Sequence, residues 1–279
     1  MMLAPVNKII PLSVVDGPGN RSAIFLQDCN LTCAYCHNPE TQRMCIHCGL
    51  CVEQCPVQAL SVKEEGQVAW DDKICTLCDR CINVCPHYAS PRIKSMSAEE
   101  VMNEVKKSIP FIRGITVSGG ECTLHPEFLT ELFILAKQEN LTCLIDSNGT
   151  IDLSLYPKLI ANCDGVMLDM KAWDPKLFHN LTGGDNAIGK KNLIYLLNEN
   201  KLEEVRIVCL PEEVDATEII RGIAKMVGAR VGEIKLKLIR FRSFGVKGRL
   251  EHTISPEDAY MEELKNLALE IGFSNIVII

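Results

Sequence analysis

The sequence predicts an α/β fold in which parallel strands and helices alternate to form a half-open or complete barrel, interrupted by a small insert rich in cysteine. Three observations lead to this prediction. Short apolar runs alternate with longer helix-like segments, polar motifs follow several of the apolar runs, and eleven of the fifteen cysteines lie between positions 29 and 85. A chain of 279 residues has room for one large domain with such an insert.

Composition excludes several classes of protein. The net charge of -7 gives no sign of a nucleic-acid or anionic-lipid partner. The sequence has no apolar run of the roughly 18 residues needed for a transmembrane helix, and its first twenty residues lack the apolar core of a signal peptide. We therefore expect a cytoplasmic protein, in which fifteen cysteines are not explained by disulfides.

The alternation of strands and helices is read from periodicity and from helix caps. Ser97, with Glu100 three residues later, is typical of a capping box, and Ser255 before Pro256 marks the start of another helix. The predicted strands are 22–27, 113–117, 141–145, 165–168, 204–209, 234–239 and 275–279. The predicted helices are 97–108, 126–139, 154–161, 187–199, 215–227 and 255–271. This order indicates parallel βαβ units.

The insert, expected at 41–90, contains the same cysteine pattern twice, thirty residues apart. Each copy reads C-x2-C-x2-C-x3-C-P, which is the run that binds [4Fe–4S] clusters in bacterial ferredoxins, where the fourth cysteine serves the other cluster. By that rule, one cluster takes Cys45, Cys48, Cys51 and Cys85, and the other takes Cys55, Cys75, Cys78 and Cys81. Zinc is the alternative, but zinc ribbons use paired C-x2-C units and lack the proline behind each run of four.

The stretch CNLTCAYCHNPE places three further cysteines at 29, 33 and 36, directly after the first predicted strand. A closed zinc or cubane site normally needs four protein ligands, so three cysteines leave one metal position open. Polar motifs also follow the next strands: SGGE at 118–121, DSNG at 146–149 and DMK at 169–171. In a (β/α) barrel these strand ends meet at one rim, where chemistry collects.

These residues resemble those of the radical S-adenosylmethionine (radical SAM) superfamily. The resemblance rests on C-x3-C-x-Tyr-Cys, with Tyr35 as the aromatic residue, and on the Gly-Gly-Glu strand end, and it spans nearly the whole chain. DGPGNR at 16–21, CHN at 36–38 and the two-cluster insert narrow it to glycyl-radical-enzyme activating enzymes, most similar to the YjjW-like group. The implied fold is a partial (β/α)6 barrel of the TIM type at 1–40 and 91–279, with the ferredoxin-like 2[4Fe–4S] domain inserted at 41–90.

The resemblance implies an activity. A [4Fe–4S] cluster on Cys29, Cys33 and Cys36 supports reductive cleavage of SAM to a 5′-deoxyadenosyl radical, which abstracts a glycine Cα hydrogen on a partner glycyl radical enzyme. Flavodoxin or ferredoxin is the implied electron donor, and a monovalent cation lies near the site carboxylates in family members. Relatives are monomers. The implied cofactor pocket comprises Tyr35, Asn38, Gly119, Gly120, Glu121, Asp146, Asp169, Lys171, Arg206 and Val208, with Glu121 receiving the methionine amino group.

Several features leave alternatives open. Relatives carry a histidine after the sixth strand, where this sequence has Arg242, and Cys122 follows Gly-Gly-Glu in place of proline or alanine. Lys235 and Lys237 alternate with apolar residues, which suits both a solvent-facing strand and an inward-facing one. A second function is a radical SAM enzyme that acts on a small molecule or peptide. Auxiliary clusters with four cysteines each speak against direct substrate ligation by the insert.

Overall fold

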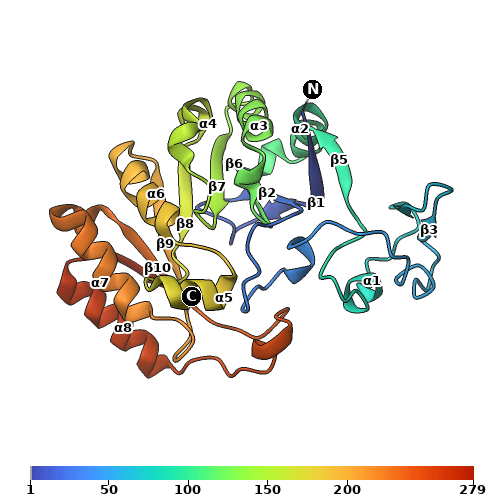
Figure 1. Ribbon diagram of the computed structural model, residues 1–279. Coiled ribbons are helices and arrows are strands. Elements are labelled where there is room, and N and C mark those ends of the chain that lie inside the picture. The colour runs from blue at the N-terminus through green and yellow to red at the C-terminus, as the bar shows by residue number, and fades with distance from the viewer. Residues whose placement is uncertain (1) are drawn as a thin grey trace.

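The computed structural model describes residues 2–279 and is built on one nine-stranded sheet in the order β11-β10-β9-β8-β7-β6-β2-β1-β5 (Figure 1). Seven neighbouring strands, from β2 to β11 in this order, run parallel, and β1 pairs antiparallel with both β2 and β5. The strands of this sheet are β1 (Leu3–Ser13), β2 (Arg21–Leu26), β5 (Lys94–Ser97), β6 (Gly114–Gly119), β7 (Thr142–Ser147), β8 (Gly165–Asp169), β9 (Leu202–Cys209), β10 (Lys235–Arg240) and β11 (Asn275–Ile278).

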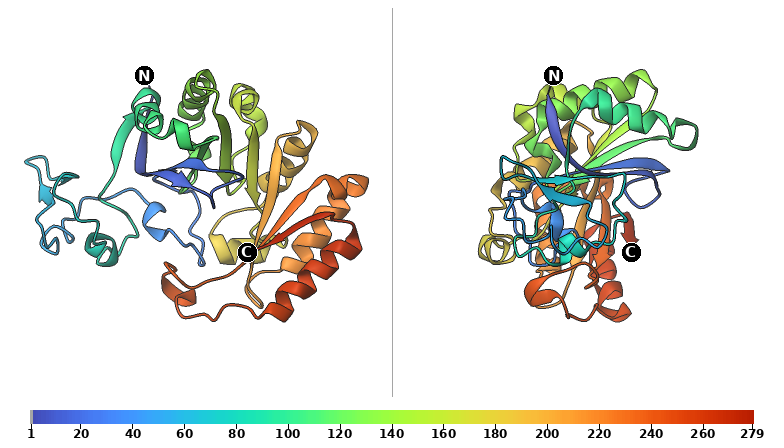
Figure 2. Two further views of the ribbon diagram at one scale, coloured as in Figure 1. Left: turned by 180° about the vertical axis from the view of Figure 1, so that it is seen from behind. Right: turned by 90° about the vertical axis from the view of Figure 1, so that its right-hand side faces the viewer.

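Helices cover the outer face of the sheet, and the curved sheet keeps its inner face free of helices (Figures 1 and 2). The α-helices of the barrel are α2 (Ala98–Lys106), α3 (Pro126–Gln138), α4 (Pro157–Asn162), α5 (Pro175–Thr182), α6 (Ala187–Asn198), α7 (Ala216–Val227) and α8 (Asp258–Ile271). Short 3₁₀ helices are η1 (Pro39–Thr41), η2 (Ile109–Phe111), η3 (Cys122–Leu124), η4 (Leu153–Leu155), η5 (Gly228–Glu233) and η6 (Gly248–Leu250). Each parallel strand except β11 leads into a helix, which gives six strand–helix units and fits the predicted partial barrel.

The main core lies between the sheet and the outer helices. Ile115 and Val117 of β6 point outward and are fully buried, as are Leu132 and Phe133 of α3, and all four belong to one apolar cluster. Burial of this apolar surface, at roughly 25 cal/mol per Å², is what holds the helices on the sheet. The outward-facing side chains thus stabilise the barrel, and the inward-facing ones are left available for the site.

Two predictions about helix starts have different outcomes. Ser97 caps α2 as expected: its side chain accepts from the backbone N–H of Glu100, and the Glu100 carboxylate accepts from the N–H of Ser97. The prediction that Ser255 starts the last helix is wrong, because the N-cap of α8 is Glu257. The carbonyl of Pro256 instead accepts a hydrogen bond from Arg240, which ties the preceding segment to the end of β10.

Sequence reasoning missed three elements of the barrel: β1, β5 and α5. Pro5 and Pro11 make a strand at β1 hard to predict, since proline cannot donate to a strand ladder. Pro11 lies where the pairing of β1 with β2 is irregular, between Ile10 and Ser13, whereas Pro5 lies opposite Ser95 of the edge strand β5. The short helix α5 was missed because eight residues are fewer than the window over which a helical pattern can be told from a loop.

The cysteine-rich segment extends from the β2 side of the sheet (Figures 1 and 2). It contains a two-stranded hairpin, β3 (Leu60–Val62) with β4 (Val68–Trp70), and one short helix, α1 (Arg80–Asn83). Its two ends meet where the N–H of Ser90 donates to the carbonyl of Glu40 over 2.9 Å. Within residues 2–279, no helix has the length and apolar character needed to cross a bilayer.

Candidate active site

A cavity of about 230 Å³ opens at the carboxyl ends of the parallel strands, where the β2 loop meets the ends of β6, β7, β8 and β9. Most of the predicted site residues line it. They are Cys29, Cys33, Tyr35, Cys36, Asn38, Gly119, Gly120, Asp146, Asp169, Lys171, Arg206 and Val208. The structure therefore brings together side chains from five separate strand ends. Ser118 and Asn148, which belong to the predicted SGGE and DSNG motifs, also line the cavity, and so does Gln42, which was not singled out from the sequence.

Gly119 and Gly120 allow the β2 loop to approach the end of β6. Gly119 has φ of +118°, and a Cβ there would lie 2.1 Å from the carbonyl oxygen of Leu26. A Cβ on Gly120 would lie 1.9 Å from the carbonyl oxygen of Asp28, which immediately precedes Cys29. Backbone hydrogen bonds close the gap, from Gly120 to Leu26 and from Glu121 to Asp28. The two glycines thus set how closely the cysteine loop can pack against the sheet.

The cysteine loop itself is fastened by α5. The N–H groups of Thr32 and Ala34 donate to the carbonyls of Thr182 and Leu181 at the end of that helix. Burial raises the pKa of Cys29 to about 12 and that of Cys33 to about 11, and it also raises the pKa of Cys36. Three half-buried cysteines on one cavity suit a bound metal centre, because coordination by a cation offsets the cost of holding a thiolate away from water.

Two ion pairs cross the opposite wall of the cavity. Arg206 on β9 contacts Asp146 on β7 (Nη1 to Oδ2, 2.9 Å), and Ser118 donates to the same oxygen over 3.1 Å. Lys171 contacts Asp169 over 2.8 Å and lies 5.6 Å from the centre of the Tyr35 ring. Burial lowers the pKa of Lys171, but Asp169, Tyr35 and Cys33 outweigh it and hold that pKa well above its usual value. The wall therefore offers fixed charges of both signs to a ligand.

Glu121 lies apart from the other predicted cofactor-binding residues. Its side chain is buried and is absent from the cavity lining, and the carboxylate faces the loop after β7. One oxygen accepts from the N–H and hydroxyl of Thr123 and from the hydroxyl of Ser147, and the other accepts from the N–H of Asn148 over 2.7 Å. Protein donors thus already contact both oxygens of this carboxylate, and it positions the Ser147–Asn148 turn; its contact with the methionine amino group of SAM stays a prediction.

The chain matches the model of the radical SAM superfamily over residues 23–221, which is more than half of its length. The chain belongs to this superfamily. The matched segment contains the cysteine loop, the Gly-Gly turn and every charged residue of the cavity wall. The prediction of a radical SAM enzyme is therefore confirmed.

Relatives narrow the radical SAM assignment. The chain is 31% identical over 267 residues to a Haemophilus influenzae protein named as a glycyl-radical enzyme activating enzyme, covering 88% of this chain and 85% of the relative. It is 28% identical over 306 residues to the indoleacetate decarboxylase activating enzyme of Tractidigestivibacter scatoligenes, covering 98% and 97%. The chain therefore belongs to the glycyl-radical enzyme activating enzymes, as predicted. The crystal structure of QueE from Escherichia coli shares the fold, with a TM-score of 0.59, 14% identity and coverage of 99% and 94%.

Two further cavities of this radical SAM protein lie in the insert, and each is lined by four cysteines. One is lined by Cys45, Cys48, Cys51 and Cys85, and the other by Cys55, Cys75, Cys78 and Cys81. Trp70 and Arg92 also line the second cavity, and the indole N–H of Trp70 is buried without a partner among the described residues. A buried donor beside four thiols fits a centre that carries acceptor sulfurs.

A larger groove, of about 750 Å³, follows the inner face of the barrel between the β1–β2 loop and the strands β10 and β11. His37, Asn38 and Ile239 line both this groove and the radical SAM cavity. Lys235 and Lys237 line the groove as well, so the structure answers the question left by their alternation: they face inward.

The other residues singled out from the sequence do not line the radical SAM cavity. Cys122, Cys143, Cys163 and Cys209 are buried in the main core, as expected for scattered cysteines. The thiol of Cys122 donates to the carbonyl of Val117 over 3.3 Å. Arg242 lines the groove and is absent from the radical SAM cavity lining, and its carbonyl contacts the ring of His37 over 2.7 Å. This contact holds the β10 loop against the cysteine loop.

Proposed function

We propose that this activating enzyme holds its catalytic [4Fe–4S] cluster on Cys29, Cys33 and Cys36. The observation that carries this proposal is the convergence of three half-buried cysteines with strand-end charges on one cavity. A fourth cysteine is absent from the described lining, which leaves one iron free to take a non-protein ligand. When bound, the cluster supplies the low-potential electron for reductive cleavage of SAM.

The chain's own side chains supply binding and orientation for SAM. Asp146, Asp169, Lys171 and Arg206 present charges to the charged methionine end, and they are already ordered by their mutual contacts. Gly119 and Gly120 bring the main chain close, while Tyr35, Asn38 and Val208 complete the lining. Preordered charges favour binding because no conformational entropy is lost when the ligand arrives. The two carboxylates Asp146 and Asp169 also suit a monovalent cation.

The groove beside the cavity supports a protein substrate. It is wide, it shares three residues with the cavity, and its outer end carries the exposed side chains of Val14, Val15 and Phe244. An extended segment of a partner would lie in it with a glycine Cα near the cavity, so that hydrogen-atom transfer from this Cα to a 5′-deoxyadenosyl radical would give 5′-deoxyadenosine and a glycyl radical. Gly17 and Pro18 of the DGPG loop line the groove, and Asp16 lies next to them, hydrogen-bonded to Ser13.

We propose that the insert, residues 41–90, is a ferredoxin-like domain of the YjjW-like type that binds two additional [4Fe–4S] clusters. The two cavities separate the eight cysteines in the way that the ferredoxin motif requires, with the fourth cysteine of each run serving the other cavity. We propose that these clusters carry electrons from flavodoxin or ferredoxin to the catalytic cluster. We also propose that the enzyme is monomeric and cytoplasmic. Its barrel domain comprises residues 1–40 and 91–279.

The activation itself is tested with a partner enzyme. Anaerobically reconstituted protein, SAM and a reductant should form 5′-deoxyadenosine, and a glycyl radical enzyme encoded beside this gene should acquire a glycine-centred doublet in its EPR spectrum. The control is the same mixture with the partner's radical glycine replaced by alanine, which should give no doublet. Formation of 5′-deoxyadenosine with no glycyl radical on any neighbouring candidate would instead favour a radical SAM enzyme for a small molecule or peptide.

A further inference from the structure

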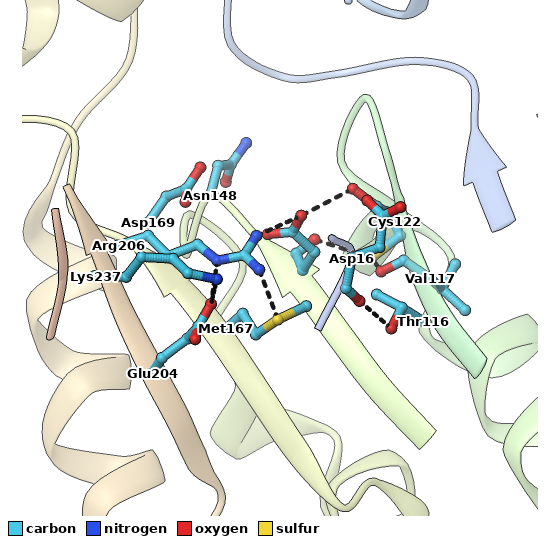
Figure 3. Close-up of polar contacts among 12 residues, drawn as sticks. Asp16, Thr116, Val117, Cys122, Asn148, Met167, Asp169, Glu204, Arg206 and Lys237 are labelled. Carbon is cyan, nitrogen blue, oxygen red and sulfur yellow. Dashed lines mark hydrogen bonds and ion pairs between the residues drawn. The ribbon is translucent and has the colours of Figure 1, made fainter. Parts of the chain in front are cut away.

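Glu204 on β9 is a fully buried carboxylate next to the cavity and is absent from its lining. One oxygen accepts from Arg206 Nε over 2.6 Å and from Lys237 Nζ over 2.9 Å, and the other oxygen lies 2.9 Å from Lys235 Nζ. Figure 3 shows Glu204, Arg206 and Lys237 in this arrangement on the inner face of the sheet. Three cations therefore surround one carboxylate in a place where an unpaired charge would be very unfavourable.

Strand geometry explains why these residues meet. Alternate residues of a strand share a face, so Glu204 and Arg206 both point into the barrel. On the neighbouring strand Lys235 and Lys237 do the same, and Lys237 lies directly opposite Arg206 in the parallel register. Burial raises the pKa of Glu204, but Arg206 and the two lysines outweigh burial and lower this pKa to about 2. Glu204 is therefore ionised at any pH at which the protein would be assayed.

The guanidinium of Arg206 is held from both sides. Its Nε faces Glu204, its Nη1 contacts Asp146 at 2.9 Å, and its Nη2 lies 2.8 Å from the sulfur of Met167 (Figure 3). A free arginine side chain has many rotamers, and fixing one of them costs entropy at the moment of binding. Contacts that fix the rotamer beforehand remove that cost from ligand binding.

We propose that Glu204 is a positioning residue that holds Arg206 against Asp146, so that the cavity is preordered for SAM, with Lys235 and Lys237 balancing its charge. The inference rests on the proposed role of the cavity in binding SAM. It adds Glu204 to the residues that affect the cavity, although Glu204 acts on the cavity only through its contact with Arg206. It also gives the two inward-facing lysines of β10 a role.

The test is Glu204→Gln, measured by the binding of radiolabelled SAM to anaerobically reconstituted protein. An amide cannot replace this carboxylate, since it has no charge and its single acceptor oxygen can take the place of only one of the two carboxylate oxygens, so its NH₂ group must face a cation. We expect the dissociation constant for SAM to rise about tenfold, equivalent to about 1.4 kcal/mol. In dithionite-driven SAM cleavage, KM should rise more than kcat falls, because the substitution weakens SAM binding and leaves the cysteine loop in place. Glu203→Gln is the matched control: Glu203 is the neighbour on the same strand and is absent from the groove lining. Its carboxylate lies 3.8 Å from Lys235, beyond hydrogen-bonding distance, and the variant should bind SAM as the wild type does.

The double variant Glu204→Gln with Lys237→Met separates positioning from charge balance. The double variant has the same net charge as the wild type, because one negative and one positive side chain are both replaced. It therefore allows the inference to be tested even where the single variant fails to fold. A positioning role predicts that SAM binding stays weak in the double variant with full iron content. Wild-type affinity in the double variant, or in Glu204→Gln alone, would overturn the inference and leave the proposed function intact. A wild-type protein that does not bind SAM would overturn both.

Discussion

Replacing Gly120 with alanine should damage the site by adding a single methyl group. The new Cβ would lie 1.9 Å from the carbonyl oxygen of Asp28, 2.5 Å from its carbonyl carbon and 2.7 Å from the carbonyl oxygen of Thr41. All three atoms are backbone, so no side-chain rotation relieves the clash. Asp28 precedes Cys29, and its N–H donates to the carbonyl of Thr41, so the movement must displace the cysteine loop.

The magnitude follows from two contributions. Overpacking by one carbon costs about 1–3 kcal/mol. Moving the loop away also weakens the hydrogen bonds from Gly120 to Leu26 and from Glu121 to Asp28, worth about 1 kcal/mol each. We therefore expect a loss of about 3 kcal/mol, and a fall in melting temperature of about 6–12 °C for a chain of this size.

Gly189→Ala is the matched control for this substitution. Gly189 is in α6, and the nearest atom to an added Cβ is 3.8 Å away, which is an ordinary contact. Alanine is favoured over glycine inside a helix by up to about 1 kcal/mol, so this variant should melt slightly higher than the wild type. The assay is thermal unfolding by circular dichroism of anaerobically reconstituted protein, followed by SAM binding. Equal melting temperatures and equal SAM binding for Gly120→Ala and the wild type would refute the close-packing argument.

Three further predictions concern the cysteine sites. Cys33→Ala should abolish SAM cleavage while roughly eight irons remain in the insert, as two four-iron clusters require; retained cleavage would contradict the assignment of the triplet. Cys51→Ala or Cys81→Ala should slow activation with flavodoxin or ferredoxin but spare it with a strong chemical reductant, and equal loss with both reductants would indicate a structural role. Trp70→Phe should make the reduction potential of the cluster nearest Trp70 more negative, because a donated hydrogen bond stabilises the reduced, more negative cluster; EPR-monitored redox titration should show one insert cluster shifted and the other unchanged, and two equal shifts would count against a local effect.

Most of the parallel strands could be predicted because they are short apolar runs with helices packed on them. The fully buried β2, for example, reads as RSAIFL, which begins one residue before the predicted run SAIFLQ, and it ends just before the cysteine loop. The partition of the insert cysteines could also be stated in advance, since it depends only on the order of the motif. The structure gathers the same two sets of four around two cavities. In both cases the information is local in the sequence or repeats at a fixed spacing.

The direction of a side chain could not be predicted where the alternatives depend on distant residues. Glu121 follows a motif typical of a cofactor site, yet its carboxylate turns toward the backbone of Asn148. Lys235 and Lys237 alternate as on an exposed strand, and only the buried Glu204 on the neighbouring strand explains why both face inward. Such pairings are tertiary contacts, and no local propensity or spacing encodes them.

The positions of the groove and the insert give the proposed mechanism a further consequence. Thr41 and Gln42 line the cavity and lead into the insert, whereas His37, Asn38 and Ile239 are the residues that the cavity shares with the groove. Electrons from the insert and a glycine-bearing segment in the groove would therefore reach the cavity past different residues. We expect a partner-derived peptide to leave the rate of cluster reduction by flavodoxin unchanged, measured by stopped-flow absorbance. Competition between the peptide and flavodoxin would mean that both use the groove side, and that the insert does not provide a separate entry for electrons.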